Sequence, residues 1–192
     1  MKRYTSCLGQ WLVLMLVCGI AGTATASSGI AERLQQGDVL LLRHAIAPGF
    51  GDPENFRVDD CSTQRNLSEE GRQQARAIGA WLRGNGIPRA KVYSSQWCRC
   101  LDTARLLDLG EVSPLPALNS FFQRPADREP NLAALRTFLA SQTPGAEPLV
   151  LVTHQVTITA LTDIFPGSGE GVVATLGEGG ELGNFERVTF AD

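Results

Sequence analysis

Two short, continuous apolar runs constrain the fold of this chain more than any other feature. "VLLLR" covers residues 39–43 and "LVLVT" covers residues 149–153. Continuous apolar runs of this length are typical of buried strands. Segments in which apolar residues recur with the period of a helix lie between these two runs and after the second. This strand–helix alternation predicts an α/β fold, with three layers (α/β/α) around a mainly parallel central sheet.

The other elements follow from capping and turn signals. Ser68 and Ser95 can each accept a hydrogen bond from the first free N–H groups of a helix, and Pro130 suits a first helical turn. The loop at residues 45–67 is rich in Gly, Pro and Asp, and loops of this length are usually functional or disordered. We expect helices within residues 68–84, 95–107, 130–141 and 155–165, a strand within 90–95, and one or two more strands within 171–176 and 184–190.

The first 26 residues have the features of a secretory signal peptide. Lys2 and Arg3 precede an apolar segment at residues 11–20, and "ATA" at residues 24–26 fits the A-x-A cleavage pattern. The apolar segment is too short to span a bilayer comfortably. We expect cleavage after residue 26, with no stable membrane span, leaving a single domain of residues 27–192 in the periplasm or outside the cell. An uncleaved membrane anchor is the alternative.

The cysteines fit an exported protein. Cys61, Cys98 and Cys100 remain after cleavage, and an oxidising compartment favours a disulfide between Cys61 and one of the other two. Cys18 leaves with the signal unless it carries a lipid anchor. A zinc site is disfavoured because the C-x-C spacing lacks the usual gap of about two to four residues. We predict neither a metal nor another cofactor.

The charge of the chain limits its partners. The formal net charge is −3, and the predicted signal carries two basic residues and no acidic one, so the remainder is mildly acidic. A mildly acidic protein is a poor ligand for nucleic acid. Recognition of a phosphorylated small molecule or glycan must therefore come from a local cluster of arginines.

The chain has only two histidines, and each follows one of the apolar runs. His44 comes directly after residues 39–43, and His154 comes directly after residues 149–153. The carboxyl ends of the strands border the ligand crevice of an open α/β sheet, so both rings are expected there. Arg43 lies at the same edge. Arg99 lies in the first turn of a predicted helix that also follows a strand, so it is expected at the same edge. The alternative is an ordinary solvent-exposed arginine that pairs with Asp102.

Two histidines and two arginines around one crevice are the side chains expected of a phosphate pocket. A neutral histidine can attack phosphorus, and water can then hydrolyse the phosphohistidine. The arginines would neutralise charge on the transferred group, and a protonated second histidine would hydrogen-bond the same oxygens. This scheme needs no metal ion.

Four segments in order resemble the histidine phosphatase superfamily, the phosphoglycerate-mutase-like proteins with an RHG motif. They are "LLRHA", "NLSEEGRQQA", "YSSQWCRCLDTA" and "VLVTHQV", and the resemblance spans about residues 39–161. It implies the phosphoglycerate-mutase-like fold. It also implies that His44 is the phosphorylated nucleophile and that Arg43, Arg99 and His154 complete the pocket.

The chain departs from the family pattern at three positions. Ala45 and Gln155 replace the glycines that usually follow the two histidines, and Asn119 stands where many members have an acidic proton donor. A substitute donor could be Asp127, Glu129, Asp59 or Asp60, or the leaving group could depart unaided. We regard Gln155 as a candidate substrate-binding residue. Arg65 is another candidate, although it could equally pair with a carboxylate.

These observations predict an exported phosphatase that hydrolyses a phosphomonoester through a phosphohistidine on His44. Phosphorylated sugars of the cell envelope, including phosphates of the lipopolysaccharide core, are candidate substrates. The alternative is a non-catalytic protein that kept the phosphate pocket and lost its proton donor at position 119.

Overall fold

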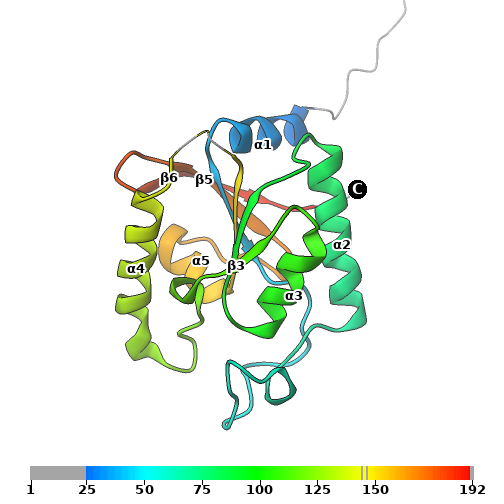
Figure 1. Cartoon of the computed structure of the whole chain (residues 1–192), viewed down its shortest axis with the longest axis vertical. Coiled ribbons are helices and arrows are strands. Elements are labelled where there is room, and N and C mark those ends of the chain that lie inside the picture. The colour runs from blue at the N-terminus through cyan, green and yellow to red at the C-terminus, as the bar shows by residue number, and fades with distance from the viewer. Residues whose placement is uncertain (1–24, 144, 146, 191–192) are drawn as a thin grey trace, which may run out of the picture.

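The computed structural model describes residues 25–143, 145 and 147–190, which form three layers around a six-stranded sheet (Figure 1). The strand order is β3-β2-β4-β1-β5-β6. The first four strands in this order are mutually parallel, and β5 and β6 each run antiparallel to the preceding neighbour. The predicted fold class is confirmed, with a mixed sheet in which parallel strands form the majority. The strands are β1 (Val39–Arg43), β2 (Lys91–Ser94), β3 (Val112–Pro114), β4 (Leu149–Thr153), β5 (Gly171–Leu176) and β6 (Leu182–Val188).

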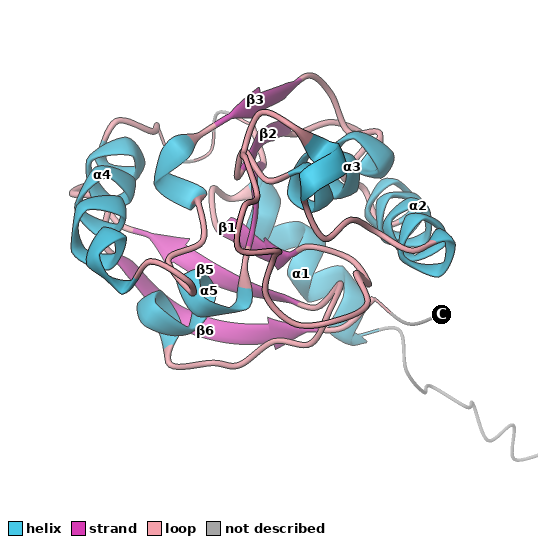
Figure 2. Cartoon of the chain, turned by 90° about the horizontal axis from the view of Figure 1, so that it is seen from below, coloured by secondary structure: helices cyan, strands magenta, loops and turns pink. Residues whose placement is uncertain are grey.

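Helices cover both faces of the sheet, which explains why the central strands are continuously apolar. Leu40 and Leu42 point into one core, and Val39 and Leu41 point into the other, because successive strand residues face opposite sides. Figure 2 shows the two helical layers on either side of the strands. The first core packs against α1 (Thr25–Gln35), α2 (Glu69–Gly84) and α3 (Cys98–Leu107); the second packs against α4 (Arg128–Ala140) and α5 (Gln155–Thr162).

The start of α2 agrees with the sequence analysis. The Ser68 hydroxyl accepts a hydrogen bond from Gly71 N at 3.0 Å, as expected of an N-cap residue. A Cβ atom at Gly71 would lie 2.0 Å from the carbonyl oxygen of Ile46. The glycine therefore lets the first turn of α2 pack directly on the backbone of the loop that follows His44.

Other predictions need correction. The helix expected from Ser95 begins three residues later at Cys98, and Trp97 at its cap makes no side-chain cap hydrogen bond. The Ser95 hydroxyl accepts from Trp97 N at 3.3 Å, and it also bonds His154 and Asn119. Helix α1 was not predicted from the sequence, and neither was the strand β3, whose three residues are too few to show a period.

Most of the predicted signal peptide, including Cys18, lies outside the described residues, and α1 begins at Thr25, just before the expected cleavage point. Among the described residues, no helix combines the length and the apolar character needed to cross a membrane.

The long loop is attached to α3 by a disulfide. Cys61 lies in a short 3-10 helix of the loop and bonds to Cys98, the first residue of α3, which confirms one of the two expected pairings. Cys100 is a buried free thiol, and burial raises its pKa to about 12, so it stays protonated and unreactive. The disulfide therefore holds the loop beside the helix that carries Arg99.

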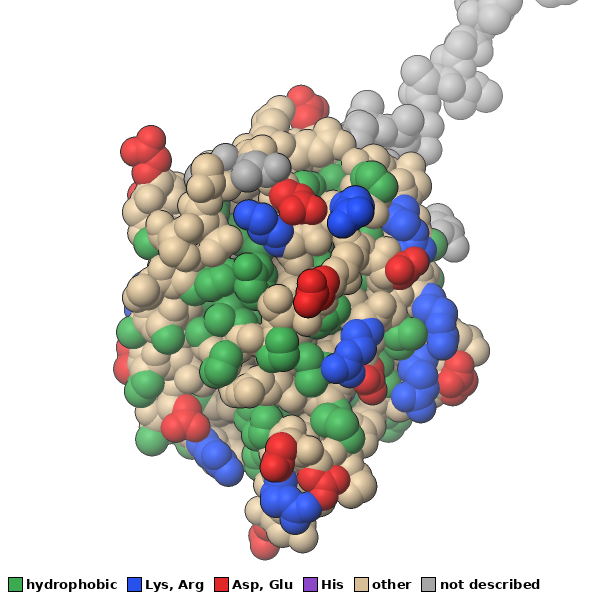
Figure 3. Space-filling model, viewed as in Figure 1, with side chains coloured by type: hydrophobic (Ala, Val, Ile, Leu, Met, Phe, Trp, Pro, Cys, Tyr) green, Lys and Arg blue, Asp and Glu red, His purple; other side chains and the backbone are tan. Residues whose placement is uncertain are grey.

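Basic and acidic side chains are interspersed on the face of the molecule shown in Figure 3, where no broad patch of a single sign is seen. That face offers no extended basic surface for a polyanion.

Candidate active site

The sheet brings the two histidines together. β1 and β4 are parallel neighbours with Arg43 opposite Thr153, and His44 N donates to Thr153 O at 3.0 Å. The two imidazole rings, of His44 and His154, have centroids 5.5 Å apart, and both are buried. The predicted meeting of the histidines at the carboxyl edge of the sheet is therefore present in the structure.

One cavity of about 110 Å³ contains every residue that the sequence placed in the pocket. Ligand pockets for larger molecules have volumes of roughly 300–1,000 Å³, so this cavity suits a group about the size of a phosphoryl. The lining residues already expected are Arg43, His44, Arg65, Arg99, His154 and Gln155; those not expected are Gly49, Phe50, Gly51, Asp52, Ser120, Phe122, Gln123 and Val156.

His44 is oriented and neutral. Its Nδ1 lies 2.8 Å from the carbonyl oxygen of Ala45, and a carbonyl can only accept, so Nδ1 carries the proton and Nε2 carries the lone pair. Burial and the charge of Arg99 lower the pKa of His44 to about 3. The ring is therefore an uncharged base with a free Nε2 at neutral pH.

Ala45 fits where the family usually has glycine. Its side chain is fully buried in a small apolar cluster with Ala47, Leu67 and Ala75, and its N–H donates to Thr103 Oγ1 at 3.0 Å. The methyl group has space here, so this departure leaves the backbone carbonyl on His44 unchanged.

His154 is held through Ser95 by Asn119. The Ser95 hydroxyl donates to Asn119 Oδ1 at 3.2 Å, so its oxygen accepts from His154 Nε2 at 2.9 Å. Gln96 N also donates to Asn119 Oδ1, at 2.9 Å, which fixes the amide orientation. Nε2 thus carries the proton, leaving Nδ1 to take up another. Burial and Arg99 lower the pKa of His154 in the free protein.

Arg99 is paired with a carboxylate that the sequence analysis missed. Asp52 Oδ1 and Oδ2 accept from the two Nη atoms of Arg99 at 2.8 and 3.1 Å, and both side chains are almost fully buried. Asp52 also accepts from Trp97 Nε1 and from Arg65 N, each at 3.0 Å. Burial disfavours ionisation of Asp52, but the hydrogen bonds outweigh it and lower its pKa. Asp102 bonds Arg105 instead.

Two buried N–H groups of the cavity have no hydrogen-bond partner among the described residues. They are Arg43 Nε and Arg99 Nε. Arg43 Nη1 donates to Pro166 O at 2.9 Å, which leaves its Nε oriented but unpaired. An unsatisfied buried donor costs about 1–3 kcal/mol.

Arg65 and Gln155 line the cavity but differ in their partners. Arg65 donates from Nε to Gly51 O at 2.8 Å and from Nη1 to Ala47 O, so its side chain bonds loop carbonyls rather than a carboxylate. Gln155 Nε2 donates to Thr159 Oγ1 at 2.7 Å. Arg65 therefore adds positive charge to the cavity while holding the loop that bears Asp52.

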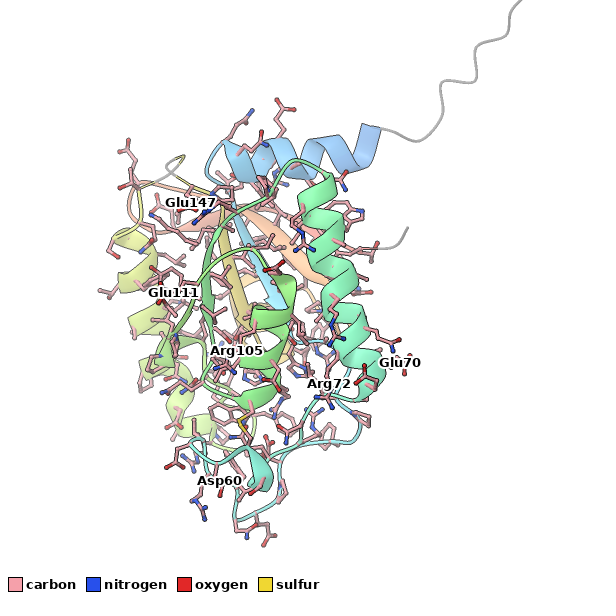
Figure 4. The ribbon with its side chains drawn as sticks, turned by 45° about the vertical axis from the view of Figure 1, so that its right-hand side comes forward. Asp60, Glu70, Arg72, Arg105, Glu111 and Glu147 are labelled. Carbon is pink, nitrogen blue, oxygen red and sulfur yellow. A yellow bond between two sulfur atoms is a disulfide. The ribbon has the colours of Figure 1, made fainter. Side chains whose placement is uncertain are left out.

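The four acids considered as proton donors do not line the cavity. Asp60 caps the 3-10 helix and pairs with Arg57 at the outer end of the loop (Figure 4). Asp59 and Glu129 are exposed, and Asp127 precedes α4. Asp52 is the one carboxylate among the lining residues described, and its low pKa keeps it ionised.

Within the described ranges, no group of three or more His, Cys, Asp or Glu residues has metal-site geometry. Cys98, once considered as a zinc ligand, is bonded to Cys61 and has no thiolate to offer.

Comparison with known proteins points to one family. The family model of the histidine phosphatase superfamily (branch 1) matches residues 39–120. No curated protein matches the chain. The protein histidine phosphatase SixA complexed with tungstate is 18% identical with a TM-score of 0.57, and the match covers 80% of this chain and 97% of that one.

Two mycobacterial structures have the same fold. "Mycobacterial hydrolase 1" is 18% identical with a TM-score of 0.56, covering 80% of this chain and 97% of that one. The mycobacterial glucosyl-3-phosphoglycerate phosphatase in complex with VO3 is 16% identical with a TM-score of 0.54, covering 80% and 98%. At such identities the structural likeness establishes the fold and nothing finer.

Proposed function

Because the chain belongs to the histidine phosphatase superfamily, we propose that it is a phosphatase that hydrolyses phosphomonoesters through a phosphohistidine on His44. The observation that carries this proposal is a neutral His44 with a free Nε2, in a cavity that Arg43 and Arg99 also line. A nucleophile and two cationic side chains line the same small space, as phosphoryl transfer requires.

The first step forms a bond between His44 Nε2 and phosphorus and breaks the bond from phosphorus to the leaving oxygen. The leaving oxygen keeps that electron pair and takes a proton from solvent. The Nδ1–H bond to Ala45 O stabilises the positive charge on the phosphorylated imidazole. Arg43 and Arg99 neutralise the charge on the transferred oxygens. His154 takes a proton from solvent on Nδ1 as the anion binds and donates it in a hydrogen bond to those oxygens.

The second step uses water. Its oxygen attacks phosphorus, the nitrogen–phosphorus bond breaks, and the electron pair of that bond returns to His44 Nε2. Inorganic phosphate leaves, and one proton of the water passes to solvent or to phosphate. His154 returns its extra proton to solvent as phosphate leaves, and His44 is then neutral again and ready for a second cycle.

The cavity favours substrates whose leaving group departs without a proton. Asp52 is ionised and bound to Arg99, so it has no proton to donate. The neutral donors nearby, Ser120, Gln123 and Gln155, have no acidic proton. Substrates with acidic leaving groups should therefore react fastest.

Export is part of the proposal. The signal-like composition of residues 1–26 and the Cys61–Cys98 disulfide both support an oxidising compartment, the periplasm or the exterior. The substrates available there include phosphorylated sugars and glycans of the envelope, such as phosphates of the lipopolysaccharide core. The proposed compartment is what supports this substrate class; the residues that line the cavity do not select it.

A second candidate function is phosphate binding without turnover. The observation that favours it is Asn119, an amide at the place of the usual acid, together with a cavity whose described lining has no protonated carboxyl group. Such a protein would keep anion affinity and lose hydrolysis.

The experiment that separates the two functions uses p-nitrophenyl phosphate, whose leaving group needs little protonation. We expect His44→Ala to lower kcat by at least about a thousandfold, with the phosphoenzyme trapped by alkaline quenching in wild type and absent in the variant. His154→Ala should turn over slowly and still label His44. Equal rates in wild type and His44→Ala, with no labelled wild type, would establish the binding function instead.

A further inference from the structure

Two exposed phenylalanines stand at the mouth of the cavity. Phe50 is 87% exposed and Phe122 is 45% exposed, whereas His44 at the bottom is 2% exposed. The two rings pack edge to face with centroids 4.9 Å apart, and both line the same cavity as the histidines. Single exposed apolar residues are common, but a packed aromatic pair beside an ionic pocket is an apolar surface at a functional position.

The aromatic pair is fixed relative to the phosphate end of the cavity. Gln123, next to Phe122, accepts from Asp52 N at 2.9 Å and donates to Asp52 O at 3.0 Å. Asp52 then continues to Arg99 through its carboxylate. Gly49 has φ +96°, a conformation that favours glycine and turns the chain so that Phe50 faces outward. The mouth is thus pre-organised rather than dependent on a loop closing.

The size of the cavity places the remainder of a substrate against these rings. A volume of about 110 Å³ accommodates the phosphoryl group, and the leaving group must extend outward. On the way out it meets Phe50 and Phe122, with Ser120 and Gln123 as the polar neighbours.

We propose that Phe50 and Phe122 form the leaving-group subsite and that it binds a leaving group with a flat, uncharged apolar face. Such a face belongs to an aromatic ring or to the C–H side of a hexose. This inference rests on the proposed phosphatase function for its biological meaning. It agrees with the lack of a proton donor among the lining residues described, because an aryl leaving group is acidic and can depart without being protonated. Aromatic contacts of this kind favour ring-bearing ligands by up to about tenfold.

The test compares two substrates with good leaving groups. p-Nitrophenyl phosphate has a ring and acetyl phosphate has none. We expect Phe50→Ala and Phe122→Ala to lower kcat/KM about tenfold for the aryl ester, mainly through KM, and to leave acetyl phosphate unchanged. Phe122→Tyr should restore the aryl rate. Phe165→Ala is the matched control, because Phe165 is 66% exposed and does not line the cavity.

A binding measurement keeps this test independent of turnover. Wild type should bind phenylphosphonate about tenfold more tightly than methylphosphonate by calorimetry, and the two alanine variants should lose that difference. A third ligand, α-glucose 1-phosphate, shows which kind of leaving group the subsite binds. If the alanine variants bind it more weakly than wild type does, the subsite binds a hexose; if its affinity is unchanged, the subsite binds an aromatic ring.

The proposal is overturned if both alanine variants keep the phenyl preference, or if they weaken methylphosphonate as much as phenylphosphonate. Failure of the phosphatase function alone would look different: no hydrolysis of either substrate, with the phenyl preference and its loss in the variants intact.

Discussion

The floor and the wall of the cavity are built by different means. The strand-end floor consists of Arg43, His44 and His154, which continue strands whose side chains fill two cores. The loop wall consists of Phe50, Asp52, Phe122 and Gln123. Side-chain hydrogen bonds, rather than a strand or a helix, hold these residues in place. The reactive groups are therefore fixed by the sheet, and the surface that selects a substrate depends on a few polar side chains.

The sharpest way to break this arrangement is to remove the carboxylate of Asp52, which joins the wall to Arg99 on α3. Asp52→Asn leaves Arg99 buried without a charged partner, and the free energy of unfolding should fall by about 3 kcal/mol. Urea denaturation measures the change. Asp102→Asn is the matched control, since Asp102 bonds Arg105 on the surface at 3.4 Å and such pairs contribute about 0.5 kcal/mol or less. Equal losses in the two variants would mean that Asp52 does not hold the wall.

The floor could be predicted from the sequence because two strong constraints coincide there. A buried strand fixes where its last residue lies, and parallel neighbours end at one edge, so His44 and His154 had to meet. Arg43 and Arg99 followed from the same placement. None of this required knowing which loop residues come close.

The wall could not be predicted because its contacts join positions far apart in loops. Asp52 lies 47 residues from Arg99, and Gln123 lies 71 residues from Asp52. Neither pair leaves a period or a spacing in the sequence. The spacing of three residues favoured Asp102 as the ion-pair partner of Arg99, but Asp102 accepts a hydrogen bond from Arg105 instead. Ser95 likewise resembled a helix cap, and its hydroxyl serves His154.

Asn119 tests whether a loop residue can tune the floor. In Asn119→Ala, Ser95 loses the acceptor of its proton and no longer presents a fixed lone pair to His154 Nε2, so the protonated imidazole that holds phosphate becomes less stable. We expect kcat for p-nitrophenyl phosphate to fall about tenfold, close to the value of one hydrogen bond. Asn119→Asp keeps the acceptor and adds a negative charge, so it should restore the rate.

The readout specific to positioning is the pH dependence of inhibition by inorganic phosphate. The pKa of the group whose protonation strengthens phosphate binding should fall in Asn119→Ala and rise in Asn119→Asp, because the new carboxylate favours an imidazolium nearby. Shifts of the same sign in both variants would show that Asn119 acts only on the packing of the loop.

The effect that develops most gradually concerns the floor alone and appears as a dependence of stability on pH. Burial and the charge of Arg99 lower the pKa of His44 to about 3 and lower that of His154 as well. In the unfolded chain both rings bind a proton near pH 6.5. Below that pH the unfolded state holds more protons than the folded state. The free energy of unfolding should therefore be constant above about pH 6.5 and fall by up to about 1.4 kcal/mol per pH unit for each histidine on acidification.

Urea denaturation of wild type and His44→Asn between pH 7 and pH 5, at constant ionic strength, measures this slope. The window avoids the carboxylates, because Asp52 titrates below its ordinary value and unfolded aspartates titrate near 4. We expect the variant to lose about half of the slope, the share of one ring. If His44→Asn keeps the full slope, folding does not lower the pKa of His44. Its ring is then charged below about pH 6.5, where it has no lone pair on Nε2 with which to attack phosphorus.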